Sequence, residues 1–281
     1  MRHLIVCRDY PPARAGGIGV YTWNISRLLV EAGETVHVVA QQWRGADKVI
    51  EKQFDGKLII HRIPFFSWKH EGSAPHESLN SEVKLMHESC PSPALLFGWQ
   101  AIGLIERLVD EEQIDLIEAS EYEAPLYHFM LRRALGLGPR RQPPCLIHLH
   151  SPTELLSQFN DEDILAPFRL YAIRHENYCI ASADAWLCPS EAMKQWAVSR
   201  YGLESAAVNV IPLPVGHVAI QPRTEDVWKH GTIAFTGRLQ PCKGVIEFVT
   251  AAVEIAKSNP DVIFDLYGSD TAYLAARNRS M

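Results

Sequence analysis

The chain begins with Leu4-Ile5-Val6-Cys7, and after a loop ending in Gly16-Gly17-Ile18-Gly19 it continues with a helical pattern over residues 18–32. The first run is apolar on both faces, which is typical of a strand covered on both sides. Because a strand, a glycine-containing turn and a helix follow one another directly, this stretch predicts the first βα unit of a parallel sheet.

The same alternation continues along the chain. Short apolar runs rich in β-branched residues lie at 36–40, 58–63, 115–118, 146–150, 185–188 and 208–211, and helices are expected at 94–112, 122–136, 161–182 and 190–201. The pattern predicts a doubly wound α/β domain, in which helices cover both faces of a parallel sheet. Residues 64–93, rich in Pro, Ser, His and Glu, interrupt it and are expected to form a long loop or excursion near the sheet edge.

A second interruption divides the chain. Prolines and a charged tail mark residues 213–230 as a linker, which separates an N-terminal Rossmann-like domain at 1–212 from a C-terminal one at 231–281. The second domain restarts with strands at 232–236 and 262–267 around a helix at 244–258. A doubly wound domain needs on the order of 100 residues or more. We therefore expect one complete Rossmann-like domain and the start of another.

Composition limits the function classes. With 281 residues, 47% of them apolar, the chain can bury a sizeable core. Its 27 Lys and Arg residues are scattered among 33 Asp and Glu residues, which argues against nucleic acid as a partner. The six cysteines form no C-x-x-C pair and suggest buried thiols in a reducing compartment. Neither a signal peptide nor a run of about 20 apolar residues is present, so a cytoplasmic location is expected.

The glycine loop at residues 11–21 is the first candidate site. Glycines at a helix N-terminus let the backbone approach an anion, and the helix dipole favours phosphate there. The loop is expected to face a ligand; a turn that only lets strand and helix pack is the alternative. Its spacing does not match the P-loop pattern G-x-x-x-x-G-K-[ST], and the second strand ends in Ala40-Gln41-Gln42 without the acidic residue of an NAD site.

The second candidate is Gly237-Arg238-Leu239-Gln240-Pro241-Cys242-Lys243-Gly244, which lies between the first strand and the helix of the second domain. The arginine fork and the lysine point charge can bracket a diphosphate, and the helix N-terminus adds to the field. Arg238 and Lys243 are thus predicted to form a diphosphate clamp. A solvated loop with two surface cations is the alternative.

The third candidate is His148-Leu149-His150-Ser151-Pro152, at the end of a predicted strand. Residues i and i+2 of a strand share a face, so both imidazoles are placed at one crevice. No third ligand is within a recognisable pattern, and a metal site is not predicted. Hydrogen bonding to a ligand and a buried structural pair both stay open. Glu121 and Tyr122, which follow the strand at 115–118, are predicted on the acceptor side, with a solvated loop as the alternative.

Together these segments resemble the retaining glycosyltransferases of family 4, which have the GT-B fold. The segment Gly16-Gly17-Ile18-Gly19-Val20-Tyr21 resembles the acceptor-domain glycine loop of that family. Ala183-Asp184-Ala185-Trp186-Leu187-Cys188-Pro189-Ser190, preceded by a helix with Glu176, is similar to its "AD-x-x-x-x-x-S" strand. Val210-Ile211-Pro212 fits its interdomain crossing, and Gly237-Arg238 through Lys243-Gly244 matches its donor-phosphate signature.

The resemblance implies transfer of a sugar from a nucleotide-diphosphate sugar to a glycan, lipid or small-molecule acceptor, with retention of configuration and without an obligatory metal or other cofactor. By the same resemblance, Arg238 and Lys243 would hold the donor diphosphate, Gly17 would approach the donor, and His150 would contact the transferred sugar near the reacting carbon. The cations and the helix dipole would stabilise the departing nucleotide. Peripheral membrane contact stays open for a lipid-linked acceptor.

One departure from the family pattern supports an alternative. The family has an E-x7-E element further into the second domain, and the chain reaches Met281 before it; Glu254 and Asp261 lie too early and in the wrong helix. A non-catalytic binding module, or an inactive remnant of the same fold, is therefore the second hypothesis. The donor nucleotide, the sugar, the acceptor and the oligomeric state are not specified by the sequence.

Overall fold

A computed structural model describes residues 1–13, 16–42, 48–64, 81–89, 93–216, 225, 231–270, 272–273 and 279–280. The chain forms two compact units, one of Met1–Thr153 and Ala166–Gly216, the other of Glu154–Leu165 and His217–Met281. Most of the predicted linker at 213–230 lies outside the described residues. The predicted domain boundaries therefore stay a prediction.

The first unit contains one large sheet. Its described strands are β1 (Arg2–Val6), β2 (Thr35–Gln41), β3 (Ile50–Gln53), β4 (Leu58–Ile63), β5 (Leu116–Ser120), β6 (Cys145–His148), β7 (Ala185–Cys188) and β8 (Val208–Val210). They lie in the order β3-β4-β2-β1-β5-β6-β7-β8, and all neighbours are parallel except the edge pair β3 and β4. The direction of winding reverses between β1 and β5. In open α/β sheets the carboxyl ends of the strands at such a point border the ligand crevice.

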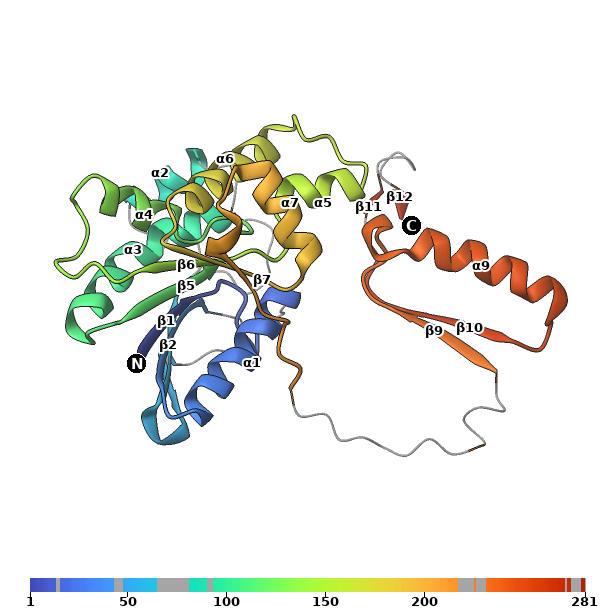
Figure 1. Ribbon diagram of the computed structural model, residues 1–281, viewed down its shortest axis with the longest axis horizontal. Helices are drawn as coiled ribbons and strands as arrows, with labels where there is room; N and C mark the ends of the chain where they lie inside the picture. Colours follow the sequence, from blue (N-terminus) through green and yellow to red (C-terminus); the bar gives the residue numbers. More distant parts are fainter. Residues whose placement is uncertain are drawn as a thin grey trace. The chain divides into compact units, whose positions relative to one another are not determined.

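Helices cover both faces of this sheet (Figure 1). The described helices between Met1 and Gly216 are α1 (Gly17–Glu31), α2 (Ser81–Ser89), α3 (Pro93–Glu111), α4 (Tyr127–Ala134), α5 (Thr153–Phe159), α6 (Pro167–Ala181) and α7 (Glu191–Tyr201). Of these, α5 begins in the first unit at Thr153 and continues in the second unit. The ends of α7 follow from its sequence. The Ser190 side chain caps the helix by accepting the N–H of Met193, and Gly202 ends it in the left-handed conformation at φ 66°.

Two apolar cores result from the alternation along the strands. Leu4 and Val6 of β1 point to the core shared with α3, α4, α6 and α7, whereas Ile5 and Cys7 point to the core shared with α1. Side chains on both faces of β1 are therefore buried, as its apolar run predicts. The predicted doubly wound α/β architecture is confirmed.

Within the region 64–93, expected to be a long loop or excursion, residues 81–89 form α2; residues 65–80 and 90–92 lie outside the described part. Two local predictions are wrong. The helix expected at 122–136 begins only at Tyr127, after a loop in which Glu123 and Ala124 have positive φ. The helix expected at 161–182 begins at Pro167, whose fixed φ suits the first turn.

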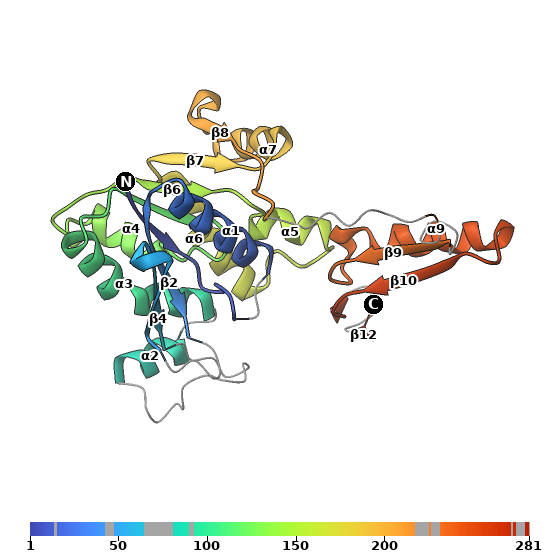
Figure 2. The same cartoon turned by 90° about the horizontal axis from the view of Figure 1, so that it is seen from below.

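The second unit pairs β9 (Thr232–Thr236) in parallel with β10 (Ile263–Tyr267), and α9 (Val245–Ser258) runs alongside them (Figure 2). β11 (Ala272–Tyr273) and β12 (Arg279–Ser280) form a short antiparallel pair. Among the described residues of this unit, Val245 is the one apolar side chain that is buried. Large apolar side chains are exposed on both strands and on the helix: Ile233, Ile246, Val249, Val253, Ile255, Ile263, Leu266 and Tyr267.

The cores of the first unit predict a contrast between two isoleucines. Ile117→Ala in β5 removes a fully buried side chain and is expected to lower the free energy of unfolding by about 2–5 kcal/mol. Ile50→Ala in β3 removes a side chain that is 50% exposed and should change it by about 0.5 kcal/mol or less. Urea unfolding followed by circular dichroism measures both, and equal losses would contradict the described core.

Candidate functional site

Four side chains meet at the point where the strand order reverses. The Tyr21 hydroxyl of α1 donates to Glu118 Oε1 of β5 at 2.6 Å. The Tyr21 ring makes edge contacts with His148 and His150, with centroid distances of 4.6 and 4.8 Å. The two imidazoles stack at 4.1 Å. The structure thus brings the predicted histidines together with a tyrosine and a carboxylate whose roles the sequence did not show.

The two histidines have different environments. His148 is 2% exposed, and its Nδ1 lies 3.7 Å from Glu118 Oε1. His150 lies in the loop two residues after the end of β6 and is half-buried. Its Nε2 has no hydrogen-bond partner among the described residues. Burial, and to a lesser degree His148, lowers the pKa of His150 to about 3. His150 is therefore a neutral imidazole with an unpartnered nitrogen. Both ring nitrogens of His148 likewise have no hydrogen-bond partner among the described residues, so for His148 the structural and the ligand-binding alternatives both stay open.

A buried carboxylate fixes the backbone at His150. Glu121 is 0% exposed, and its two oxygens accept the N–H of His150 at 2.8 and 2.9 Å. The N–H of Ser151 donates to the same carboxylate at 2.5 Å. Burial raises the pKa of Glu121 to about 7, although these backbone donors oppose the shift. The acceptor-side role predicted for Glu121 is not favoured by this burial; Tyr122, in the same loop, is half-buried.

A second buried carboxylate, on α6, holds the neighbouring backbone. Glu176 accepts the N–H groups of Glu123 and Thr153, both at 2.8 Å, and the Thr153 hydroxyl at 2.5 Å. Burial raises the pKa of Glu176 to about 8, and the charge of Glu121 adds to the shift. The loops after β5 and β6 are therefore joined through α6.

An ion-pair group links the loop after β1 to the loop after β5. Arg8 Nη1 lies 2.8 Å from Glu123 Oε2, and Arg8 Nε lies 3.0 Å from Asp9 Oδ1. Gln41 Nε2 also donates to Asp9 Oδ1, at 3.0 Å. The charged residues lie in two loops that are far apart in the sequence and form no recognisable pattern, and sequence reasoning therefore missed this group.

Gly17 is the first residue of α1, and Gly16 precedes it with extended backbone. A Cβ atom built on either glycine would meet no heavy atom within 4 Å. Packing therefore does not require glycine at these two positions, which favours the ligand-facing interpretation of the loop over the packing alternative. The first N–H groups of the helix have no partners within it and are available to an anion.

Arg238 and Lys243 belong to the second unit, on the loop between β9 and α9. Gly237 N donates to Tyr267 O at 2.9 Å, and Leu239 N donates to Ser269 O at 3.0 Å. These bonds hold the loop against the end of β10 and the residues that follow it. A Cβ on Gly268 would come within 1.6 Å of the Gly237 oxygen, which only glycine avoids. Both cations are exposed, and neither forms an ion pair with the rest of the described chain. Their placement fits the predicted clamp.

The sequence profile of Glycosyltransferase Family 4 matches residues 15–217, which include α1, the loops after β5 and β6, and α6. The chain belongs to glycosyltransferase family 4. The resemblance predicted from the motifs is confirmed. The predicted end of the chain within the second domain is not tested by this match.

The similarity of the chain to individual proteins is consistent with this family assignment. The chain is 23% identical over 260 residues to a D-inositol 3-phosphate glycosyltransferase of Kribbella flavida, a match that spans 88% of the chain and 55% of the relative. A trehalose-6-phosphate synthase superposes with a TM-score of 0.59 at 14% identity, over 95% of the chain and 65% of the enzyme. The catalytic domain of starch synthase IV of Arabidopsis thaliana superposes with a TM-score of 0.53 at 14% identity, over 95% of the chain and 68% of the domain. These structures show the shared GT-B fold, and the chain spans about half the length of the curated relative.

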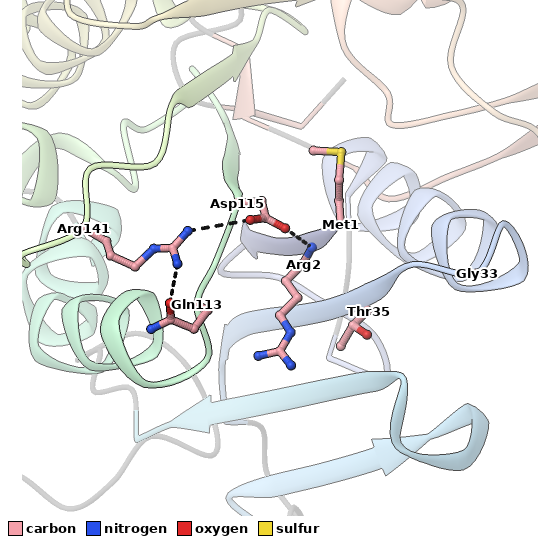
Figure 3. Close-up of a pocket in the computed structure, with 7 residues that line it drawn as sticks. All are labelled: Met1, Arg2, Gly33, Thr35, Gln113, Asp115 and Arg141. Carbon is pink, nitrogen blue, oxygen red and sulfur yellow. Dashed lines mark hydrogen bonds and ion pairs between the residues drawn. The ribbon is translucent and has the colours of Figure 1, made fainter.

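A cavity of about 420 Å³ in this family 4 chain lies at the opposite end of the sheet, where the strands begin (Figure 3). Its acidic group is already paired: Asp115 Oδ2 accepts the backbone N–H of Arg2 at 2.8 Å, and Arg141 Nη2 lies 3.7 Å from Asp115 Oδ1. Ligands of doubly wound sheets bind at the carboxyl ends of the strands. The candidate site at His150 lies at the carboxyl ends of the strands, whereas this cavity does not.

Three further observations bear on partners of the family 4 chain. In the described part of the chain, no three His, Cys, Asp or Glu side chains are placed to bind a metal ion together. No described helix combines the length and apolar character needed to cross a membrane. Five cysteines are free thiols, four of them buried and Cys242 half-buried; Cys90 lies outside the described residues.

The two buried carboxylates of the family 4 chain predict a pH dependence of stability. The folded pKa values of Glu121 and Glu176 lie above the ordinary 4.5, so the folded protein keeps protons that the unfolded chain has released. This stabilisation is complete below about pH 4.5 and is lost as the pH rises through 7 and 8. Between pH 6 and 9 the free energy of unfolding should fall by about 1–3 kcal/mol.

Glu176→Gln, which cannot ionise, should flatten this dependence even if it lowers stability at pH 6. Glu106→Gln, which removes a half-buried carboxylate paired with Arg132 at 2.7 Å, is the matched control and should keep the slope. Urea unfolding at several pH values measures the three slopes. Equal slopes in all three proteins would show that Glu176 is ionised in the fold.

Proposed function

We propose that this protein transfers a sugar from a nucleotide-diphosphate sugar to an acceptor, with retention of configuration. The observation that carries the proposal is His150, which lies within the family-matched segment at the carboxyl edge of the sheet. It offers a neutral imidazole whose buried Nε2 has no hydrogen-bond partner among the described residues. A group of this kind can hydrogen-bond a sugar hydroxyl without attracting an anion in its place.

The donor diphosphate is assigned to the second unit. Arg238 supplies a planar fork and Lys243 a compact charge, and both are exposed at the start of α9. Negative charge builds on the diphosphate as the bond to the sugar breaks, and fixed cations near a helix N-terminus stabilise that charge. The proposal therefore needs no obligatory metal or other cofactor, since the protein supplies the positive charge.

The sugar is assigned to His150, and Gly17 is assigned to the approach of the donor. With a pKa near 3, His150 does not act as the general base of the reaction, because it binds a proton too weakly. Its contribution is a positioned hydrogen bond to the sugar. The open space at Gly17 leaves room for the donor against the first turn of α1.

The acceptor is proposed by class: a glycan, a lipid or a small molecule. Names of related proteins support this range, since one is a D-inositol 3-phosphate glycosyltransferase and another, a starch synthase, was determined with ADP and acarbose. Buried free thiols support a reducing compartment, and hence the cytoplasm, as the place of the reaction.

A non-catalytic binding module of the same fold is the second candidate. The observation that favours it is the second unit, whose strands and helix leave most of their apolar side chains exposed. A unit with so little buried apolar surface gains little stability from its own core. Catalysis requires the donor phosphates to be held firmly, so donor binding separates the two candidates.

The clamp is tested by binding. Arg238→Ala and Lys243→Ala are each expected to weaken the binding of a nucleoside diphosphate roughly ten- to hundredfold, because each removes a charge-assisted contact to phosphate. Lys257→Ala, which removes an exposed lysine of α9 paired with Glu254 at 2.6 Å, is the matched control. Calorimetry with UDP, GDP and ADP measures the affinities. Unchanged affinity in both variants, or no binding by the unsubstituted protein, would favour the binding-module candidate.

His150 is tested by turnover in a transfer-active form of the protein. His150→Ala is expected to lower kcat roughly a hundredfold, as for the loss of a positioned donor in other active sites. Affinity for the nucleoside diphosphate should stay close to that of the unsubstituted protein. His150→Gln keeps a hydrogen-bonding amide and should recover part of the rate. Full turnover in His150→Ala would return this residue to a structural role.

A further inference from the structure

The backbone around His150 is irregular and depends on side chains for its hydrogen bonds. Residues 149–152 belong to neither a strand nor a helix. The N–H groups of His150 and Ser151 find their acceptor in Glu121, a carboxylate from the loop after the neighbouring strand. Buried N–H groups need an acceptor, and here no element of regular structure supplies one.

The next residues depend on a second carboxylate. Thr153 starts α5, and both its N–H and its hydroxyl donate to Glu176. Glu176 also accepts the N–H of Glu123, two residues after Glu121. Each carboxylate thus connects the loop after β5 with the loop after β6.

We propose that Glu121 and Glu176 are positioning residues, which hold the backbone on both sides of His150 so that its imidazole stays against Tyr21 and His148. The effect on transfer rests on the proposed function, whereas the fixation of the loop does not. An error of about 1 Å in the place of a reacting or orienting group can cost a hundredfold in rate. Residues that touch no substrate therefore control the reaction by fixing the one that does.

The observed contacts explain why the ring needs this support. His150 is held by stacking on His148 and by an edge contact with Tyr21, and its Nε2 has no hydrogen-bond partner in the described part of the chain. Aromatic contacts restrict the ring less than hydrogen bonds do. The orientation of the imidazole is therefore set mainly by its backbone, which the two carboxylates fix.

The test compares variants of the 281-residue chain by NMR spectroscopy. Glu121→Leu removes both acceptor oxygens at similar volume, and Glu121→Gln keeps one of them. Exchange of the His150 and Ser151 amide hydrogens should rise at least about tenfold in Glu121→Leu and less in Glu121→Gln. The ring signals of His150, shifted by Tyr21 and His148, should move toward those of an exposed histidine.

Glu106→Leu is the matched control, because it removes a carboxylate that joins α3 to α4 through Arg132. It should leave both signals of His150 unchanged. Glu176→Gln should speed exchange at Glu123 and Thr153 in the same way. Exchange and ring signals that stay unchanged in the Glu121 variants, or that change equally in the control, would overturn the proposal; if Glu121→Leu does not fold, Glu121→Gln decides alone.

Turnover separates this proposal from the proposed function. In a transfer-active form, Glu121→Gln should lower kcat about tenfold without changing nucleotide affinity, and it should have no further effect when His150 is already alanine. Faster exchange together with no transfer by the unsubstituted protein would remove the proposed function and keep the positioning, whereas full turnover in His150→Ala would return His150 to a structural role. Unchanged exchange would remove the positioning, whatever the turnover.

Discussion

The parallel pairing of β1 with β2 on one side and β5 on the other is the constraint on which the rest of the structure depends. Because the winding reverses there, the loops that leave β1 and β5 lead to helices on opposite faces of the sheet, α1 and α4. α1 starts directly above this point, and Tyr21 reaches across it to Glu118. The position of His150 on the adjacent strand end then follows from the strand order.

Buried carboxylates accept the backbone N–H groups of the loops at this point. Loops that approach a core leave N–H groups without partners, because neither a helix nor a strand continues there. Glu121 and Glu176 accept these groups, and the desolvation that raises the pKa of each carboxylate is the cost of that arrangement. The same bonds join two loops that are distant in sequence. The same hydrogen bonds therefore satisfy the backbone N–H groups and orient His150.

Much of this fold follows from local pattern, and the remainder depends on distant contacts. Apolar runs predicted the parallel strands, whereas the polar edge strand Ile50–Gln53 and the short helix α5 gave no such signal. Gly17, His150, Arg238 and Lys243 stand out by residue type beside predicted strand ends. Tyr21 and Glu118 are 97 residues apart, and only the folded chain shows that they meet. Glu121 was predicted from its position, but its burial depends on α6 and β6.

The distribution of charge agrees with the nucleotide-sugar donor of the proposed function. Around His150 the neutral imidazole and the Tyr21–Glu118 pair can hydrogen-bond hydroxyls, and burial favours the protonated forms of Glu121 and Glu176. The loop before α9 carries two exposed cations that form no ion pair with the described residues, and cations of this kind suit phosphate. A protonated His150 would compete for the anionic part of the proposed donor. In this proposal, the burial that keeps the imidazole neutral therefore favours the sugar over the diphosphate at His150.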